Sequence, residues 1–294
     1  MMIIDLQNIP TAQRQQYLQT AIAPRPICLA STVDKEGNVN LSPFSFFNMF
    51  STQPPVVIFS PSRRVRNNTT KHTLENVKEV PEVVIHIVDE SIVQQVSLSS
   101  CEYPKSVNEF VKAGFTQEPA TLVKPPMVKE AKVKMECRVM EIKSLGEEGG
   151  AGNLVICEVL RMHIDESILN EQNMIDQRKL HHVARLGANW YCRVKEDNLF
   201  EVEKPNVKLG IGFDNLPDHI KHSRVLTGNH LGLLANVHEI PEINPGYTNE
   251  RLTHIYHYFT ASPEDLENEI HRLAAGLLDE GKVEEAWQVL LSTG

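Results

Sequence analysis

Short strand-like segments joined by tight turns dominate the first 200 residues of the chain. Residues 26–33 and 39–47 both favour an extended backbone, and only the polar residues 34–38 separate them. A connection this short joins antiparallel strands, because parallel strands need a crossover of a dozen or more residues. This part of the chain is therefore predicted to be mainly β, as a small antiparallel barrel with attached helices.

The remaining elements of this part follow from residue periodicity and from turn residues. Further strands are predicted at residues 56–60, 83–88, 132–142 and 154–164, and a strand or turn at 185–191. Helices are predicted at residues 11–22, 71–79, 90–98 and 107–113. Thr70 is positioned to cap the second helix. The glycine-rich segment 146–152 turns the last pair of strands into a long hairpin.

The chain changes character near residue 205, which divides it into two predicted domains. Residues 1–204 form the barrel domain, and residues 205–294 form a C-terminal extension that is loop-rich at first and then helical. Ser262 is a good helix cap because Pro263 and acidic residues follow it. Apolar residues at helical spacing continue from there, and a last helix contains Trp287.

The composition is that of a soluble globular protein, with 41% hydrophobic and 23% charged residues. No apolar run is long enough to span a membrane, and the first ten residues lack the basic cluster of a signal peptide. The five cysteines form no C-x-x-C pair, which favours free thiols over disulfides or a zinc site. We therefore expect a cytoplasmic protein without a membrane partner.

Charge is distributed unevenly along the chain. The net charge of −9 disfavours nucleic-acid binding. Residues 61–74 nevertheless contain Arg63, Arg64, Arg66 and Lys71 and no acid. This cation cluster follows a predicted strand and leads into a predicted helix, whose N-terminus would attract an anion. Arginine forks suit phosphate oxygens, so the cluster indicates a small anionic ligand.

Neighbouring hydroxyl and amide groups could complete an anion site. The possible donors are Ser60, Ser62, Asn68 and Thr73. The alternative interpretation is a solvated surface turn. The cluster is not a P-loop, because it lacks the glycine-rich sequence. Segment 146–152 has the glycines, but Glu147 and Glu148 would repel phosphate, so we interpret it as a turn alone.

An aromatic run precedes the cation cluster. In one extended strand, Phe44 and Phe46 would share a face, and Ser45 and Phe47 would share the other. Most of these rings are expected in the core. Ser45 and Asn48 are then polar groups among aromatics and need partners if they are buried, which the polar edge of a flavin ring would provide.

Histidine pairs in the C-terminal extension do not complete a metal site. His219 and His222, and also His254 and His257, have a spacing that could place two imidazoles on one helix face. No cysteine or carboxylate set accompanies either pair, so we predict no bound metal. The sequence contains neither G-x-S-x-G nor H-E-x-x-H, and we name no catalytic side chain.

Several motifs, taken in order, resemble one known family. They are Pro24-Arg25-Pro26-Ile27, residues 40–48 and 54–60, Arg63-Arg64, and residues 71–76, 100–104 and 185–191. Together they resemble the flavin reductase-like, FMN-binding split-barrel family, which includes flavoredoxin, over about residues 20–203. The family usually has Lys-Asp-Thr where this chain has Lys71-His72-Thr73, a departure that concerns the detail of the phosphate contacts.

The resemblance implies a homodimeric split β-barrel with FMN near the subunit interface. The isoalloxazine ring would be bordered by Ser45, Phe46, Phe47 and Asn48. The phosphate would be held by Ser60, Arg63, Arg64, Lys71 and Thr73. Arg185 would lie near the ring or the partner subunit.

The expected function is that of an FMN-dependent oxidoreductase of the flavin reductase type. Hydride would arrive from NADH or NADPH, and electrons would leave to a small-molecule or protein acceptor. No G-x-G-x-x-G fingerprint is present, so the nicotinamide would lie over the flavin. One alternative is a flavoredoxin-like electron carrier reduced by a protein partner. Another is an interaction protein that acts through its acidic C-terminal helices.

Overall fold

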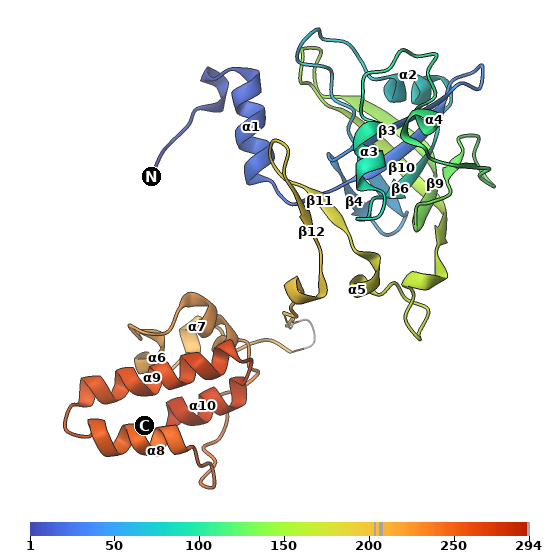
Figure 1. Ribbon diagram of the computed structural model, residues 1–294. Coiled ribbons are helices and arrows are strands. Elements are labelled where there is room, and N and C mark those ends of the chain that lie inside the picture. The colour runs from blue at the N-terminus through green and yellow to red at the C-terminus, as the bar shows by residue number, and fades with distance from the viewer. Residues whose placement is uncertain (203, 206–207, 293–294) are drawn as a thin grey trace. The chain divides into compact units, whose positions relative to one another are not determined.

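The computed structural model describes residues 1–202, 204–205 and 208–292 (Figure 1). The chain divides into two compact units, Met1–Phe200 and Glu201–Gly294. Each unit has its own hydrophobic cluster, so each is described by itself.

A seven-stranded antiparallel sheet organises the first unit, with the order β3-β2-β6-β9-β10-β5-β4. The strands are β2 (Cys28–Val33), β3 (Val39–Phe44), β4 (Phe47–Ser51), β5 (Val56–Phe59), β6 (Glu82–Ile87), β9 (Val133–Ser144) and β10 (Asn153–Ile164). β3 and β4 lie at opposite edges although only two residues separate them. Six strand spacings of a flat sheet would measure roughly 29 Å, whereas the chain from Phe44 to Phe47 reaches at most about 11 Å. The sheet is therefore curled into a half-barrel.

Smaller elements surround the sheet. β1 (Arg25–Pro26), β11 (Val183–Arg185) and β12 (Tyr191–Arg193) form a three-stranded sheet, and β7 (Gln117–Glu118) pairs with β8 (Met127–Val128). The helices are α1 (Thr11–Ala21), α2 (His72–Glu79), α3 (Val93–Leu98), α4 (Glu109–Ala113) and α5 (Gln177–Leu180). Figure 1 shows α1 beside the hairpin of β11 and β12, to one side of the half-barrel.

The two faces of the curled sheet carry separate apolar clusters. The inner one contains Phe44, Phe59, Leu74 and Val77, so that α2 closes it. The second packs residues of β2 and β3 under α3 and α4, with Phe110 fully buried. β2 is buried along its whole length because it contributes to both clusters. A mainly β, split-barrel fold is confirmed.

The predicted strand 39–47 is wrong in one important respect. β3 ends at Phe44, a bend follows at Ser45 and Phe46, and β4 begins at Phe47. Phe44 is buried, whereas Phe46 is 40% exposed, so the two rings do not share a face. The reason is the closure of the half-barrel, which requires the chain to turn where a simple alternation would continue.

Three helix starts also differ from prediction, one of them that of α4, which begins at Glu109 and not at residue 107. α2 begins after Lys71, and Thr70 does not cap it, because the Thr70 hydroxyl donates to Glu75 Oε1 at 2.7 Å instead. α3 begins at Val93, three residues later than predicted. The predicted turn 146–152 does connect β9 to β10.

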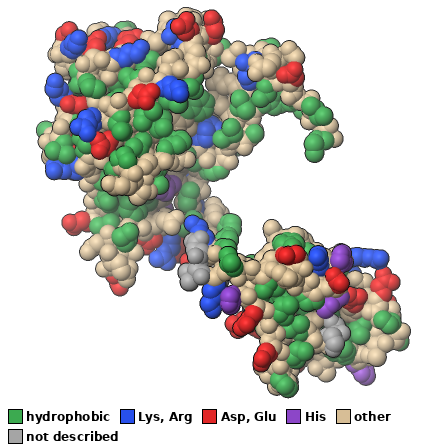
Figure 2. Space-filling model, turned by 180° about the vertical axis from the view of Figure 1, so that it is seen from behind, with side chains coloured by type: hydrophobic (Ala, Val, Ile, Leu, Met, Phe, Trp, Pro, Cys, Tyr) green, Lys and Arg blue, Asp and Glu red, His purple; other side chains and the backbone are tan. Residues whose placement is uncertain are grey.

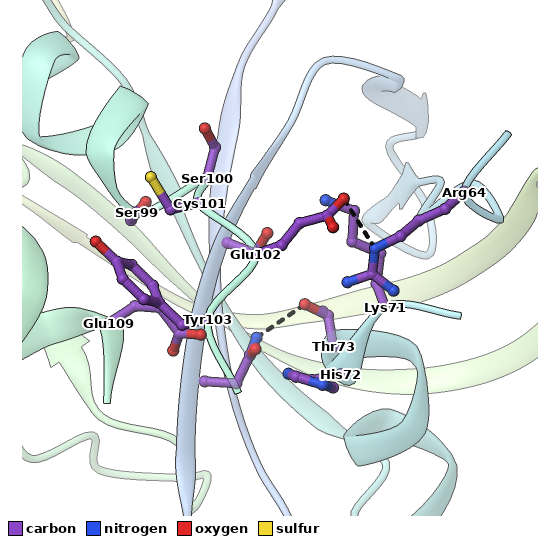
Figure 3. A pocket seen from close by; sticks show the side chains of 12 residues that line it. Arg64, Lys71, His72, Thr73, Ser99, Ser100, Cys101, Glu102, Tyr103 and Glu109 are labelled. Carbon is purple, nitrogen blue, oxygen red and sulfur yellow. Dashed lines mark hydrogen bonds and ion pairs between the residues drawn. The ribbon is translucent and has the colours of Figure 1, made fainter. Parts of the chain in front are cut away.

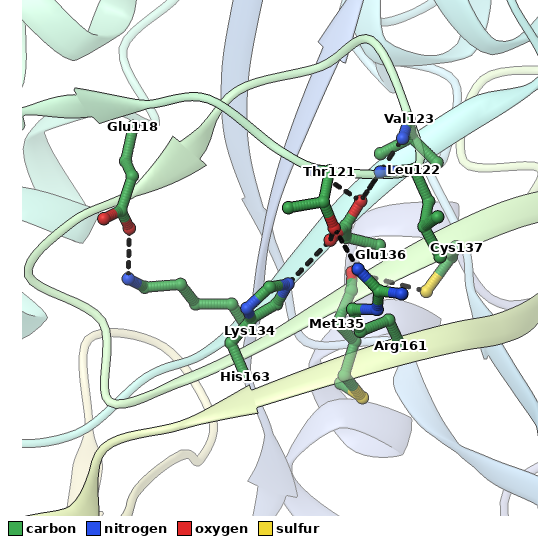
Figure 4. Close-up of polar contacts among 10 residues, drawn as sticks. All are labelled: Glu118, Thr121, Leu122, Val123, Lys134, Met135, Glu136, Cys137, Arg161 and His163. Atoms are coloured by element: carbon green, nitrogen blue, oxygen red, sulfur yellow. Dashed lines mark hydrogen bonds and ion pairs between the residues drawn. The ribbon is translucent and has the colours of Figure 1, made fainter.

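Two buried polar side chains fasten loops to the sheet. His86 on β6 hydrogen-bonds to Leu29 O and accepts from Val128 N, both at 2.8 Å. The buried Glu136 carboxylate on β9 accepts from the backbone N–H groups of Thr121, Leu122 and Val123 (Figure 4). Thr121 Oγ1 and His163 Nε2 also bond to it. Because each group is satisfied, these contacts fix residues 119–128 against β6 and β9.

The hydrophobic core of the C-terminal unit is formed by helices. It comprises α6 (Asp218–Lys221), α7 (Gly228–Ala235), α8 (Glu250–Phe259), α9 (Pro263–Asp279) and α10 (Val283–Leu291), packed around the fully buried Trp287. The sequence predicted the last two helices and missed the first three. α6 is one turn long and α7 contains two glycines, so packing, not intrinsic propensity, sustains them. The described helices include none long and apolar enough to cross a membrane.

The structure shows the contacts of the first histidine pair of this unit. His222 Nδ1 lies 3.0 Å from Asp218 O, and His219 stacks on His271 with 6.3 Å between ring centroids. Within residues 1–202, 204–205 and 208–292, no three His, Cys, Asp or Glu side chains come together in a metal-binding group.

Candidate functional site

A cavity of about 750 Å³ lies on the first unit, between α1, the segment after β5 and the β9–β10 turn. The apolar part of its wall includes Leu18 from α1, Ile22 directly after that helix, and Phe46 from the bend. The cationic part is formed by Arg63, Arg64 and Lys71. Small-molecule sites commonly measure 300–1,000 Å³ and combine apolar walls with a few polar groups. This cavity has both the size and the mixed lining of such a site.

The arginines fold the segment after β5 into a tight loop. Arg63 donates to Asn68 Oδ1 at 2.5 Å and to Asn68 O at 2.7 Å. Arg64 donates to Thr69 Oγ1 at 2.9 Å and to Thr70 O. Asn68 has a positive φ of 54°, which asparagine tolerates better than most residues. The arginine spacing thus builds the loop and brings its cations to the cavity.

Lys71 differs from the three arginines because each of them is paired with at least one described residue, as hydrogen-bond donor or ion pair, and Lys71 is not. It is the residue before α2, so its ammonium lies near the helix N-terminus. In the described chain, its side chain makes no ion pair or hydrogen bond. Burial and, second, the neighbouring Arg64 lower the pKa of Lys71, while Glu102 acts in the opposite direction. A bound anion would relieve both penalties on the charged form.

The β9–β10 turn rests directly on the arginine segment. Gly150 N donates to Arg63 O at 3.0 Å, and Arg63 N donates to Ala151 O at 2.8 Å. A Cβ on Gly149 would lie 3.0 Å from Val65 O, and one on Gly152 would lie 2.7 Å from Ser60 Oγ. The glycines are therefore needed for close approach as well as for turning. Sequence reasoning missed this role, although four glycines in seven residues exceed what a turn requires.

Arg25 holds α1 at the edge of the cavity. The buried guanidinium donates to Gln19 O and to Ile22 O (2.6 Å) near the end of the helix. It also donates to Leu186 O, at 2.8 Å, in the β11–β12 turn. α1 buries no side chain of its own, so Leu18 and Ile22 remain exposed toward this region. The helix is thus fastened by its backbone and leaves apolar side chains for a ligand.

The structure brings only some of the predicted site residues together. Phe46, Arg63, Arg64 and Lys71 line the large cavity. Ser45, Phe47, Asn48, Ser60, Thr73 and Arg185 are not in its lining. Thr73 is fully buried and accepts from Asn40 Nδ2 at 2.9 Å. Arg185 instead donates to Trp190 O and lies over the Tyr191 ring. The roles of all ten residues stay predictions.

A second, much smaller cavity of about 20 Å³ adjoins the same cations (Figure 3). Arg64 and Lys71 line both cavities, and residues 99–103 form one wall of the smaller one. Its size suits about one water molecule. The buried Glu109 also lines it, accepts from Leu41 N at 3.1 Å, and has its pKa raised by burial. The smaller cavity is a polar recess behind the cationic wall.

The sequence matches the model of the flavin reductase like domain over residues 20–184. The chain therefore belongs to the flavin reductase-like family. It is 36% identical, over 172 residues, to a protein of Aquifex aeolicus, a match that covers 58% of this chain and 85% of that protein.

Solved structures of the same fold are also similar. One is nitrilotriacetate monooxygenase component B from Bacillus cereus, with 30% identity and a TM-score of 0.64. That match covers 69% of this chain and 98% of the other. Flavoredoxin of Desulfovibrio vulgaris shares the fold, with 21% identity and a TM-score of 0.52. That match covers 61% of this chain and 90% of the flavoredoxin chain.

Proposed function

We propose that this protein binds FMN in the large cavity and works as an NAD(P)H-dependent flavin reductase. The observation that carries the proposal is Lys71, a half-buried cation that no described residue pairs with, beside Arg64 in a cavity with an apolar wall. A ligand that satisfies this lining has an anionic end and a planar apolar end. The phosphate and ring system of FMN provide the two, and the family is flavin-related.

Each part of the lining has a distinct task in this proposal. Lys71 and Arg64 bind the phosphate, with the Ser62 hydroxyl as a further donor. Phe46, Leu18 and Ile22 contact the ring and exclude water from it. The flavin itself accepts hydride and passes electrons on, so no protein acid or base is needed for that chemistry. The protein contributes binding, orientation and an apolar surface that excludes water from the ring.

The electron donor is proposed to be NADH or NADPH, and the acceptor a small molecule or a partner protein. Support comes from the similar component B, whose name associates it with a monooxygenase. All five cysteines are free thiols, which fits the reducing cytoplasm where pyridine nucleotides are available.

Anaerobic reduction of the FMN-loaded protein tests the proposal. NADH is added to one sample and NADPH to another, and the visible flavin band is followed. Prompt bleaching supports a pyridine-nucleotide-dependent reductase, and the two rates identify the donor. Bound flavin that stays oxidised would favour the electron carrier reduced by a protein partner. Failure to retain FMN would contradict the assignment of the cavity.

We also propose that the protein is a homodimer. Strands β9, β10, β5 and β4 follow one another at one end of the sheet, and three of them expose large apolar residues. These are Met49 and Phe50 on β4, Met140 on β9, and Leu160 and Met162 on β10. Figure 2 shows hydrophobic side chains gathered over this unit. A second copy packed on these strands would remove the exposed apolar side chains from water.

A further inference from the structure

One carboxylate already occupies part of the cationic wall. Glu102 Oε1 lies 3.1 Å from Arg64 Nε (Figure 3). Glu102 Oε2 lies 2.7 Å from Arg66 Nη2. Glu102 belongs to the polar segment between α3 and α4 and lines the smaller cavity with Arg64 and Lys71. Its side chain is 48% exposed, so it reaches the arginines from the solvent side.

The charges around this carboxylate show what it opposes. In the described chain, Glu102 is the only acid that forms an ion pair with the cluster Arg63, Arg64, Arg66 and Lys71. Arg63 uses its guanidinium on the neutral Asn68. Glu102 also acts on Lys71, whose protonated form it favours. The carboxylate thus makes, on Arg64, the kind of contact that a phosphate oxygen would make.

We infer that Glu102 is an internal competitor for the ligand phosphate, and that it sets the affinity so that FMN is exchanged instead of permanently held. The inference rests on the proposed function. An arriving phosphate must share or take Arg64 from Glu102, and it is repelled by a negative charge within a few ångströms. The phosphate therefore adds less to the affinity for FMN than it would if the four cations faced no carboxylate. The preference for FMN over riboflavin, which lacks the phosphate, is correspondingly smaller.

Binding of FMN and of riboflavin to the full-length protein tests this inference. Glu102→Gln keeps the size and polarity of the side chain and removes its charge. We expect FMN to bind about tenfold more tightly to this variant and to dissociate correspondingly more slowly. Riboflavin, which lacks the phosphate, should bind with unchanged affinity. The gain for FMN should shrink toward zero at about 1 M salt, because screening removes the repulsion.

A matched control separates the site from general charge effects. Glu118 is 41% exposed and pairs with Lys134 at 2.7 Å, outside both cavities. Glu118→Gln removes the same charge from a similar ion pair and should leave FMN affinity unchanged. The salt dependence of FMN binding to the unaltered protein gives a second measurement, which we expect to be shallower than that of Glu102→Gln.

The outcomes distinguish this inference from the proposed function. If FMN binds and Lys71→Met weakens it, but Glu102→Gln binds FMN no more tightly, Glu102 only orients the arginines and the inference is overturned. An equal gain for riboflavin would overturn it as well, because the effect would not involve the phosphate. If Lys71→Met does not weaken FMN binding, the proposed site itself is wrong.

Discussion

At the scale of single residues, burial and charge decide what each polar group does. Lys71 and Arg64 carry the same charge and line the same cavity. Arg64 is committed to its own loop and to Glu102, whereas Lys71 is not paired with any described residue. The two cations therefore differ in what binding an anion would require: Arg64 would have to be shared with its present partners, whereas Lys71 would not.

Lys71→Met should weaken FMN binding about 10- to 100-fold, because a charge-assisted contact to phosphate is lost. Riboflavin affinity should not change. The melting temperature should not fall, because the variant removes a cation that burial penalises. Fluorescence titration with both flavins measures the effect. Lys78→Met, an exposed change on the same helix, is the control. Equal losses for FMN and riboflavin would contradict a phosphate contact.

His86 makes the stability of the first unit depend on pH. Burial lowers its pKa from 6.5 to about 4, so the unfolded chain takes up the proton at a higher pH than the folded chain does. Its contribution is complete above pH 6.5 and falls as the pH drops toward 4, by roughly 3 kcal/mol in total. Urea denaturation between pH 7 and pH 5 measures this slope.

A comparison with His86→Gln isolates that histidine. His182, in the same unit, also has a pKa lowered first by burial, so it contributes in the same direction. Burial likewise lowers the pKa of His271, which affects the C-terminal unit. Burial raises the pKa of Glu136, but hydrogen bonds from Thr121 and His163 outweigh it and lower the pKa to about 2. Glu136 therefore changes the free energy of unfolding mainly below the pH range of this experiment. The variant should be less stable at pH 7 and should lose less stability on going to pH 5. An unchanged slope would show that His86 is not responsible.

At the scale of elements, contact between the β9–β10 turn and the loop after β5 builds the site. The two segments exchange backbone hydrogen bonds through Arg63, Gly150 and Ala151. Their approach depends on glycine because backbone atoms of Arg64 and Val65 lie where a side chain of residue 149 would begin. A long hairpin thereby supports a cationic loop that lies about 85 residues earlier in the sequence.

Gly149→Ala should disturb both stability and ligand binding. The added Cβ would meet Val65 O at 3.0 Å and Arg64 O at 3.1 Å, and backbone cannot move as freely as a side chain. We expect a loss of about 1–3 kcal/mol in the free energy of unfolding and several-fold weaker FMN binding. Gly276→Ala on α9, with nothing near its Cβ, is the control and should be neutral or stabilising. Unaltered FMN affinity would show that the β9–β10 turn does not support the binding site.

At the scale of the whole molecule, exposed apolar strands predict association of two copies. The unaltered protein should sediment at about twice the chain mass of 33.2 kDa. Phe50→Glu and Met162→Glu should each shift it toward the monomer, because a charge would be buried at the interface. Val111→Glu, equally exposed but on α4, should not. A monomeric unaltered protein would refute the dimer. The acidic C-terminal helices as an interaction surface remain a prediction.

Local sequence patterns were sufficient for β2, β5, β6, β9 and β10, for the two last helices and for the cation cluster, because each depends on neighbours in the chain. The break at Ser45 and Phe46 was not predictable from alternation, since it results from closure of the half-barrel. The meeting of Phe46, Lys71, α1 and the β9–β10 turn was equally hidden.

The sequence by itself determined a β-rich unit, a cationic loop at the end of a strand and a family resemblance. The tertiary structure decided which of the ten predicted residues share a cavity, that glycines 149 and 152 permit a close contact, and that Glu102 reaches Arg64. The physical reason is that periodicity and propensity act over a few residues. The curl of the sheet and the strand pairing bring segments together that are far apart in the chain.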